Sequence, residues 1–178
     1  MFVTPSELGG YMLKRIATGA IMILALGTAS AVQAQTAEKA AEFAKGCAAG
    51  DMTSCVNLGV SYKDGLGVPK DPARALTLFE QACTAKQLDG CFYTAIAYHA
   101  GDGAPIDLKR AIRSYELACY YGSARGCYWN GVMWARGQGT EARFDMAIYM
   151  FKKALVIDPN HTESKDAIAR LEKLQAEK

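Results

Sequence analysis

The sequence contains little histidine and little net charge, and each shortage excludes a class of function. Among 178 residues there are two histidines, His99 and His161, and 20 Lys and Arg oppose 18 Asp and Glu, a formal charge of +2. A nucleic-acid partner usually requires a concentrated basic face, which nothing in this sequence indicates. Zinc hydrolases usually have several histidine ligands, which are scarce here, and a histidine-based nucleophilic triad would have only His99 or His161 to draw on. We therefore expect no nucleic-acid partner, no metal, no cofactor and no recognisable catalytic residue.

Long apolar runs are also missing, and the apolar run near the start is typical of a secretory signal peptide. Lys14 and Arg15 form a basic patch, and the apolar residues 16–26 that follow are too few to span a bilayer. Small residues come next, and Val-Gln-Ala ends at Ala34 with a small residue at position −3 and alanine at −1. This order predicts a signal peptide over residues 1–34.

Three alternatives remain for this leader. Cleavage after Ala31 would also follow a small-residue motif, and Met12 could be the true initiator, which would make residues 1–11 a misassigned start. The apolar run could instead be an uncleaved anchor, although its length argues against that. With cleavage after Ala34, residues 35–178 form the mature protein, which we expect in the periplasm or outside the cell without a stable membrane span.

The remaining chain is an internal repeat with a period of 36 residues. The period is clearest in the cysteines, which form pairs eight residues apart, and the pairs are 36 residues apart. Alanines, aromatic residues and Gly-x-Gly sequences keep the same register. The six cysteines are Cys47, Cys55, Cys83, Cys91, Cys119 and Cys127.

Each repeat contains the signals for two helices. Apolar residues within 71–85 recur at i, i+3, i+4, i+7 and i+8, which indicates one buried stripe on a helix. Asp71 and Asp107 are predicted N-caps. A second helix is predicted over about 90–100, and the Gly-x-Gly sequence after it is suited to a helix end.

The helix pattern resembles the tetratricopeptide class. Leu58-Gly59-x-x-Tyr62 precedes Ala75-x-x-x-Phe79, which is the order of the helix-packing residues in that class. The period here is longer, however, and the connecting loop over 64–69 is rich in glycine.

Period, loop and cysteines are similar to the Sel-one-like repeat proteins, and to their cysteine-rich, Hcp-type bacterial branch, over about residues 39–174. This resemblance implies an all-α fold, a right-handed α/α solenoid of about four 36-residue helix-turn-helix repeats with three internal disulfides. The repeat domain would cover 35–178, with a tetratricopeptide-like ending and a polar C-terminal cap over 143–178.

The eight-residue spacing of the cysteines predicts their connectivity. In one straight helix, residues eight apart lie about 12 Å from each other, whereas a disulfide requires Cα atoms within about 7 Å. The pairs can bond if the chain turns between them, and 48–51, 86–89 and 121–123 are plausible turns. An exported chain with an even number of cysteines favours disulfides over zinc or redox chemistry, since no Cys-x-x-Cys occurs. We predict Cys47–Cys55, Cys83–Cys91 and Cys119–Cys127.

The resemblance also implies two functions. Repeat solenoids present an extended surface to partners, so we expect a scaffold that binds a peptide or a protein on its concave face. The alternative is a β-lactam-binding or β-lactamase-like protein, because Hcp-type proteins are often described in that way. The Ser-x-x-Lys, Ser-Asp-Asn and Lys-Thr-Gly motifs of serine β-lactamases do not occur in the sequence. We therefore expect that the chain is not an enzyme.

By analogy with tetratricopeptide folds, the helices that carry the Leu-Gly-x-x-Tyr pattern line the partner-binding face. Aromatic residues and arginines are frequent interface anchors, and an arginine here could face a carboxylate of the partner. The predicted partner-binding residues are Val56, Val60, Lys63, Phe92, Ile96, His99, Arg125, Tyr128, Val132 and Arg136.

Overall fold

The computed structural model describes residues 32–177, and these residues form helices and no strands, as predicted. The signal peptide expected over 1–34 lies outside the described residues, except for its last three positions, which belong to the helix over 32–48. The other helices are α2 (Met52–Asp64), α3 (Pro72–Thr84), α4 (Leu88–Ala100), α5 (Leu108–Tyr120), α6 (Ala124–Arg136), α7 (Phe144–Ile157) and α8 (Thr162–Ala176).

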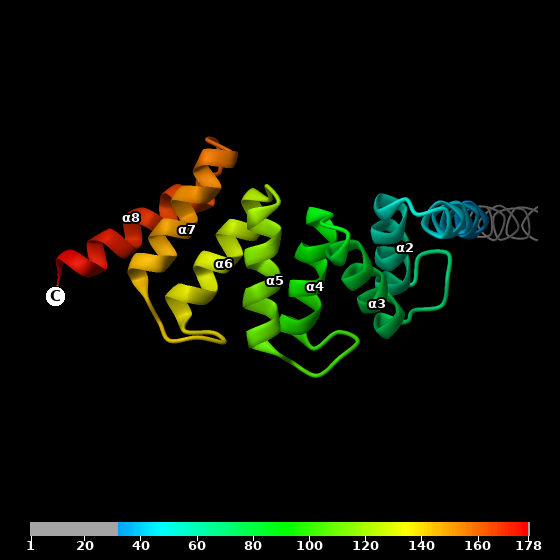
Figure 1. The fold of residues 1–178 in the computed structure, drawn as a ribbon, viewed down its shortest axis with the longest axis horizontal. Coiled ribbons are helices and arrows are strands. Elements are labelled where there is room, and N and C mark those ends of the chain that lie inside the picture. Colours follow the sequence, from blue (N-terminus) through cyan, green and yellow to red (C-terminus); the bar gives the residue numbers. More distant parts are fainter. Residues whose placement is uncertain (1–31, 178) are drawn as a thin grey trace, which may run out of the picture.

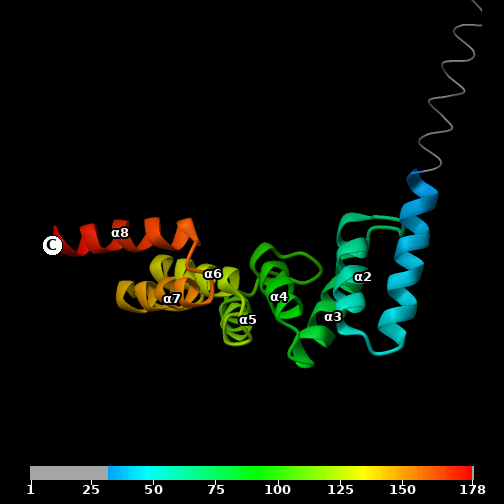
Figure 2. The same ribbon diagram turned by 90° about the horizontal axis from the view of Figure 1, so that it is seen from above.

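The helices form a solenoid in which each helix packs against the next one along the chain (Figure 1). Seen from above, α2, α4 and α6 lie along one edge of the molecule, and α3, α5 and α7 lie along the other (Figure 2). α2 also contacts α4 directly. The repeat in the sequence is therefore a repeat in space, and equivalent residues return to the same side of the molecule every 36 positions.

The predicted start and stop signals act as helix caps. The carboxylates of Asp71 and Asp107 each accept a hydrogen bond from the backbone N–H three residues later, at the starts of α3 and α5. The first glycine of each Gly-x-Gly sequence ends α2, α4 or α6 in the left-handed conformation, with φ of 75° at Gly65, 80° at Gly101 and 66° at Gly137. A residue with a Cβ is strained in that conformation.

The second glycine of each Gly-x-Gly sequence allows the loop to contact a helix that lies one helix further back in the chain than the helix the loop follows. A Cβ on Gly67, Gly103 or Gly139 would overlap a backbone carbonyl of helix 32–48, α3 or α5 respectively. The helix over 32–48 thus has the same relation to its loop as α3 and α5 have to theirs.

The core consists of aromatic rings and alanines that recur with the period. Phe79, Tyr115 and Phe151 occupy one register position on α3, α5 and α7, and all three side chains are buried. Ala82 and Ala118, three residues further on, are fully buried. Because alanine is small, the backbones of neighbouring helices can approach closely there, and this approach positions the disulfides.

The three predicted disulfides are confirmed. Their Cα atoms are 4.4 to 4.5 Å apart, and they join helix 32–48 to α2, α3 to α4 and α5 to α6. Each turn between the paired cysteines contains one residue with positive φ at the same register position: Gly50 (90°), Lys86 (67°) and Gly122 (99°). The last pair, α7 and α8, has no cysteines.

Candidate functional site

The structure buries two of the residues predicted to bind a partner. Val56 and Phe92 are each 4% exposed. Val56 packs in a cluster with Phe79, and the ring of Phe92 makes an edge contact with Tyr115 at 5.7 Å between centroids. Both side chains belong to the core, so they cannot contact a partner, and the prediction is corrected at these positions.

The other predicted residues reach the surface to different extents. Arg125 and Arg136 are exposed, while Val60, Ile96 and Val132 are half-buried on α2, α4 and α6, one period apart. Lys63 and His99 are half-buried near the ends of α2 and α4. Tyr128 is half-buried as well, and its ring packs on Phe151 and His161 with centroids 5.5 and 5.3 Å apart.

Two aromatic residues that the sequence reasoning missed lie on this surface. Tyr93 on α4 is half-buried, and Trp129 on α6 is 38% exposed. Tyr93 stacks on Phe79 with centroids 5.0 Å apart, and Trp129 stacks on Tyr115 at 6.4 Å. Both lie three residues before Ile96 or Val132, so they share one helical stripe with these residues. That spacing was the signal that could have found them.

We call this surface the even-helix face. It is a stripe of side chains along the accessible sides of α2, α4 and α6. Its members are Asn57, Val60, Tyr93, Ile96, Arg125, Trp129, Val132 and Arg136.

The two arginines of the even-helix face differ in their availability. Arg125 lies 3.9 Å from the Asp89 carboxylate, from Nη2 to Oδ1, and its guanidinium stands over the ring of Phe92, 4.7 Å from the centroid. These contacts join α6 to α4. Within residues 32–177, Arg136 forms no ion pair. A carboxylate of a partner would therefore meet an uncompensated charge at Arg136 and a compensated one at Arg125.

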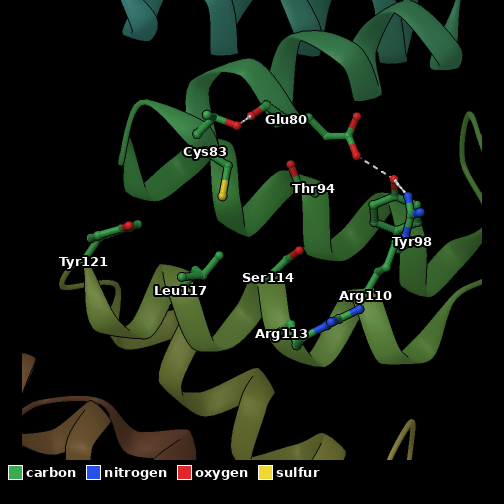
Figure 3. Close-up of a pocket in the computed structure, with 10 residues that line it drawn as sticks. Glu80, Cys83, Thr94, Tyr98, Arg110, Arg113, Ser114, Leu117 and Tyr121 are labelled. Atoms are coloured by element: carbon green, nitrogen blue, oxygen red, sulfur yellow. Dashed lines mark hydrogen bonds between the residues drawn. The ribbon is translucent and has the colours of Figure 1, made fainter.

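A groove with a volume of about 580 Å³ lies between α3 and α5, on the side of α4 that is opposite to the even-helix face (Figure 3). Thr94 and Tyr98 of α4 line it. Successive residues of an α-helix are rotated by about 100° around the helix axis. By this rotation Thr94 and Tyr98 lie on a side of α4 roughly opposite to that of Tyr93 and Ile96. The groove and the even-helix face are thus separate surfaces on one helix. The other residues that line the groove are Glu80, Cys83, Thr84, Arg110, Arg113, Ser114, Leu117 and Tyr121.

One end of the groove is closed by a hydrogen-bonded tyrosine. The Tyr98 hydroxyl donates to Glu80 Oε1 at 2.5 Å and accepts from Arg110 Nη1 at 2.7 Å, and the guanidinium stands over the Tyr98 ring. Burial raises the pKa of the Tyr98 hydroxyl, and the bond to Glu80 raises that pKa further, although Arg110 acts in the opposite direction. Tyr98 therefore stays protonated at neutral pH and joins α3, α4 and α5.

The second histidine is a helix cap. His161 precedes α8, and its Nδ1 accepts from the Ser164 N–H at 3.3 Å. In the described part of the chain, no cluster of three or more His, Cys, Asp and Glu side chains is arranged to hold a metal ion. No helix within residues 32–177 is long and apolar enough to cross a membrane.

Comparison with known proteins identifies the repeat. The family model for the Sel1 repeat matches residues 53–86, 88–123 and 115–155. These segments correspond to α2–α3, α4–α5 and α6–α7, so helix 32–48 and α8 flank three family repeats. A search among curated proteins found no match.

Solved structures with similar folds include three bacterial proteins. Cysteine-rich protein B of Helicobacter pylori has 22% identity and a TM-score of 0.59, with 78% of this chain and 96% of that protein covered. A protective antigen of uropathogenic Escherichia coli with an SLR fold has 24% identity and a TM-score of 0.65, covering 68% of this chain. A Sel1 repeat protein from Oxalobacter formigenes has 20% identity and a TM-score of 0.62, covering 66% of this chain.

The chain spans 26% of the length of the E. coli antigen and 48% of the O. formigenes protein. At these identities the likeness shows the fold alone. The family model, in contrast, matches more than half of the 178 residues. Proteins of this family typically act as scaffolds for protein–protein interactions. By period, helix pairing and family model together, the chain belongs to the Sel1 repeat family.

Proposed function

We propose that this protein is an exported scaffold that binds an extended segment of a peptide or protein on its even-helix face. The supporting observation is the stripe of half-buried Tyr93, Ile96 and Val132 with the partly exposed Trp129, on α4 and α6. It lies beside Arg136, which forms no ion pair within residues 32–177. Tryptophan, tyrosine and arginine are the side chains that most often dominate binding energy at interfaces. An extended segment fits because the stripe runs over more than one helix.

Export is supported by the three disulfides and by the signal peptide expected over 1–34. Disulfides persist in the bacterial periplasm and outside the cell, whereas the cytosol keeps thiols reduced. We expect the mature chain to begin at Gln35. Fractionation of the source bacterium followed by N-terminal sequencing tests this directly. A cytosolic protein that retains its first residues would contradict export.

Site-specific photo-crosslinking tests the even-helix face. The photoreactive amino acid p-benzoylphenylalanine is incorporated at position 93 or 129, and at position 120 as a control. Tyr120 is 76% exposed on α5, so it offers a more accessible aromatic position off this face. We expect one and the same protein to be captured from positions 93 and 129 and not from 120.

A second variant makes the result specific. Trp129→Ala combined with Arg136→Gln removes an anchor and a charge. Because the Trp129 ring also stacks on Tyr115, the melting temperature should fall, and circular dichroism at the assay temperature checks that the helical fold persists. We expect the crosslink from position 93 to be lost in this variant. If position 120 captures the same protein, or if the double variant crosslinks as well as the parent, the even-helix face is not the binding surface.

We further propose that the protein does not hydrolyse β-lactams. The three sequence motifs of serine β-lactamases do not occur in the chain. The purified, oxidised protein should leave a chromogenic cephalosporin unchanged. Hydrolysis that persists through purification and co-elutes with the protein would overturn this.

A further inference from the structure

We propose that the groove between α3 and α5 binds the carboxyl terminus of a peptide whose last side chain is apolar. The groove lies on the side of α4 that faces away from the even-helix face, so this site does not depend on the function proposed above. In Figure 3, Tyr98 and Arg110 lie at one end of the groove, Leu117 and Tyr121 lie at the other, and Thr94 and Ser114 lie between them.

A buried hydroxyl in the groove has no partner. Thr94 is 4% exposed, and within the described residues its Oγ1 has no hydrogen-bond partner. Buried polar atoms in native proteins are nearly always paired, and an unpaired one is costly. Figure 3 shows this oxygen directed toward the groove, with the hydroxyl of Ser114 across from it. Both hydroxyls can donate, so they suit a ligand that supplies acceptor oxygens.

The available cation in the groove is Arg113. Arg110 is occupied, since its Nη1 donates to Tyr98 and its Nε lies 3.4 Å from Asp107. Arg113 donates from Nε to the Lys109 carbonyl at 3.3 Å, and within residues 32–177 it forms no ion pair. A guanidinium binds a carboxylate through two parallel hydrogen bonds. Arg113 and the two hydroxyls together therefore favour a carboxylate.

The other end of the groove is apolar. Leu117 and Tyr121 line it together with the half-buried Cys83 of a disulfide. In the last residue of a peptide, the carboxylate and the side chain branch from the same Cα, so both can be placed in one short groove. The volume of about 580 Å³ is in the range of small-ligand sites, roughly 300–1,000 Å³. A chain end fits these dimensions.

Glu80 provides a test of the charge argument. It is the one acidic side chain that lines the groove, and its carboxylate would repel a ligand carboxylate at Thr94. Replacement by glutamine keeps an oxygen that accepts from the Tyr98 hydroxyl and removes the negative charge. Glu80→Gln should therefore strengthen binding, an effect that damage to the fold does not produce.

The experiment uses fluorescence anisotropy with the purified, oxidised protein. The probe is fluorescein-labelled Gly-Gly-Ser-Ala-Leu with a free carboxylate, and its control is the same peptide as a C-terminal amide. We expect the acid to bind roughly tenfold more tightly than the amide, the ratio typical of one charge-assisted hydrogen bond. A peptide that ends in serine should bind more weakly than the one that ends in leucine.

Four variants complete the design. Arg113→Gln should weaken binding of the acid and leave binding of the amide nearly unchanged. Thr94→Val should weaken binding of the acid, and Glu80→Gln should strengthen binding of the acid. Arg136→Gln, an exposed arginine on the even-helix face, should have no effect. Equal binding of acid and amide, or equal loss from Arg113→Gln and Arg136→Gln, overturns the proposal. Crosslinking from position 129 is unaffected by either outcome, so the two proposals can fail separately.

Discussion

At the scale of single residues, Thr94 and Asn130 occupy one register position in consecutive repeats and differ in their hydrogen bonding. Asn130 is 1% exposed, and its Nδ2 donates to the Ile112 carbonyl of α5 at 2.9 Å. The hydroxyl of Thr94 has no such partner in the described structure. The same position thus carries a bond between neighbouring helices in one repeat, where the Asn130 Oδ1 alone is unpaired, and a side chain with no hydrogen bond in the other, within the described residues.

This difference predicts opposite effects on stability. Thr94→Val removes an unpaired polar atom while conserving shape, so the free energy of unfolding should stay constant or rise by about 1 kcal/mol. Asn130→Leu removes a bond that is made and should lower the free energy of unfolding by about 1 kcal/mol. Urea denaturation of both variants measures this. A loss of stability in Thr94→Val equal to that in Asn130→Leu would mean that the Thr94 hydroxyl is paired in the folded protein.

The predicted partner-binding residues show what sequence periodicity can and cannot locate. A period of 36 residues identifies equivalent positions, and Val60, Ile96 and Val132, which are one period apart, are all half-buried. It does not say how far each helix is rotated against its neighbours. One residue of an α-helix corresponds to about 100° of rotation. Phe92 is therefore in the core, while Tyr93, the next residue, is on the accessible side.

At the scale of helix pairs, each disulfide lies beside a crossing where one of two facing residues is glycine. In the second and third crossings the glycine is on the later helix, and a Cβ there would lie 2.6 Å (Gly90) or 2.8 Å (Gly126) from the Cβ of Ala82 or Ala118. In the first crossing the glycine is Gly46, on the earlier helix. Ser54 occupies the position equivalent to Gly90, and a Cβ on Gly46 would lie 2.8 Å from the Ser54 Cβ. At all three crossings one of the two facing residues lacks a Cβ. In the second and third crossings a Cβ on the glycine would also lie 2.7 or 2.8 Å from the backbone N of Cys83 or Cys119, so the backbones themselves are close there.

This exchange predicts a compensating pair of substitutions. Gly90→Ser alone should lower the free energy of unfolding by about 1–3 kcal/mol, because overpacking a close contact shifts the backbone. The double variant Ala82→Gly/Gly90→Ser copies the residues of the first crossing. It removes the overlap between the two Cβ atoms but keeps the close approach to the Cys83 backbone N, so its loss should be smaller than the sum of the two single losses but should not vanish. Thermal and urea denaturation of all four proteins gives this coupling energy. Additive losses would show that the contact does not limit the approach of α3 and α4.

The helices and the disulfides could be predicted because their signals are local. The carboxylates of Asp71 and Asp107, the Gly-x-Gly sequences and the eight-residue cysteine spacing each act within a few residues. The groove could not be predicted, since its lining comes from three helices and no short motif marks it. The bond from Tyr98 to Glu80 spans 18 residues, and its partner Arg110 is 12 residues away on the next helix.

At the scale of the whole molecule, the covalent links are unevenly distributed. Contacts in this solenoid run mainly between neighbouring helices, and stability in such folds is approximately a sum of local terms. The first three helix pairs each carry one disulfide. The last pair, α7 and α8, depends on packing, on the cap at His161 and on the buried Leu171. Reduction should therefore destabilise the three disulfide-linked helix pairs more than the pair α7 and α8.

Reduction should lower the melting temperature strongly. Each disulfide closes a loop of nine residues, and the loop-entropy relation assigns such a link about 2.5 kcal/mol. Three of them together approach the net stability of a small domain, about 5–15 kcal/mol. Calorimetry of the reduced, alkylated protein against a mock-treated sample measures the shift. Hydrogen exchange, recorded below the new melting temperature, should accelerate in helix 32–48 and in α2 to α6. It should change little in α7 and α8, which contain no cysteine. An unchanged melting curve would show that the links do not stabilise the fold, and equal acceleration in α8 would show that their effect is not local.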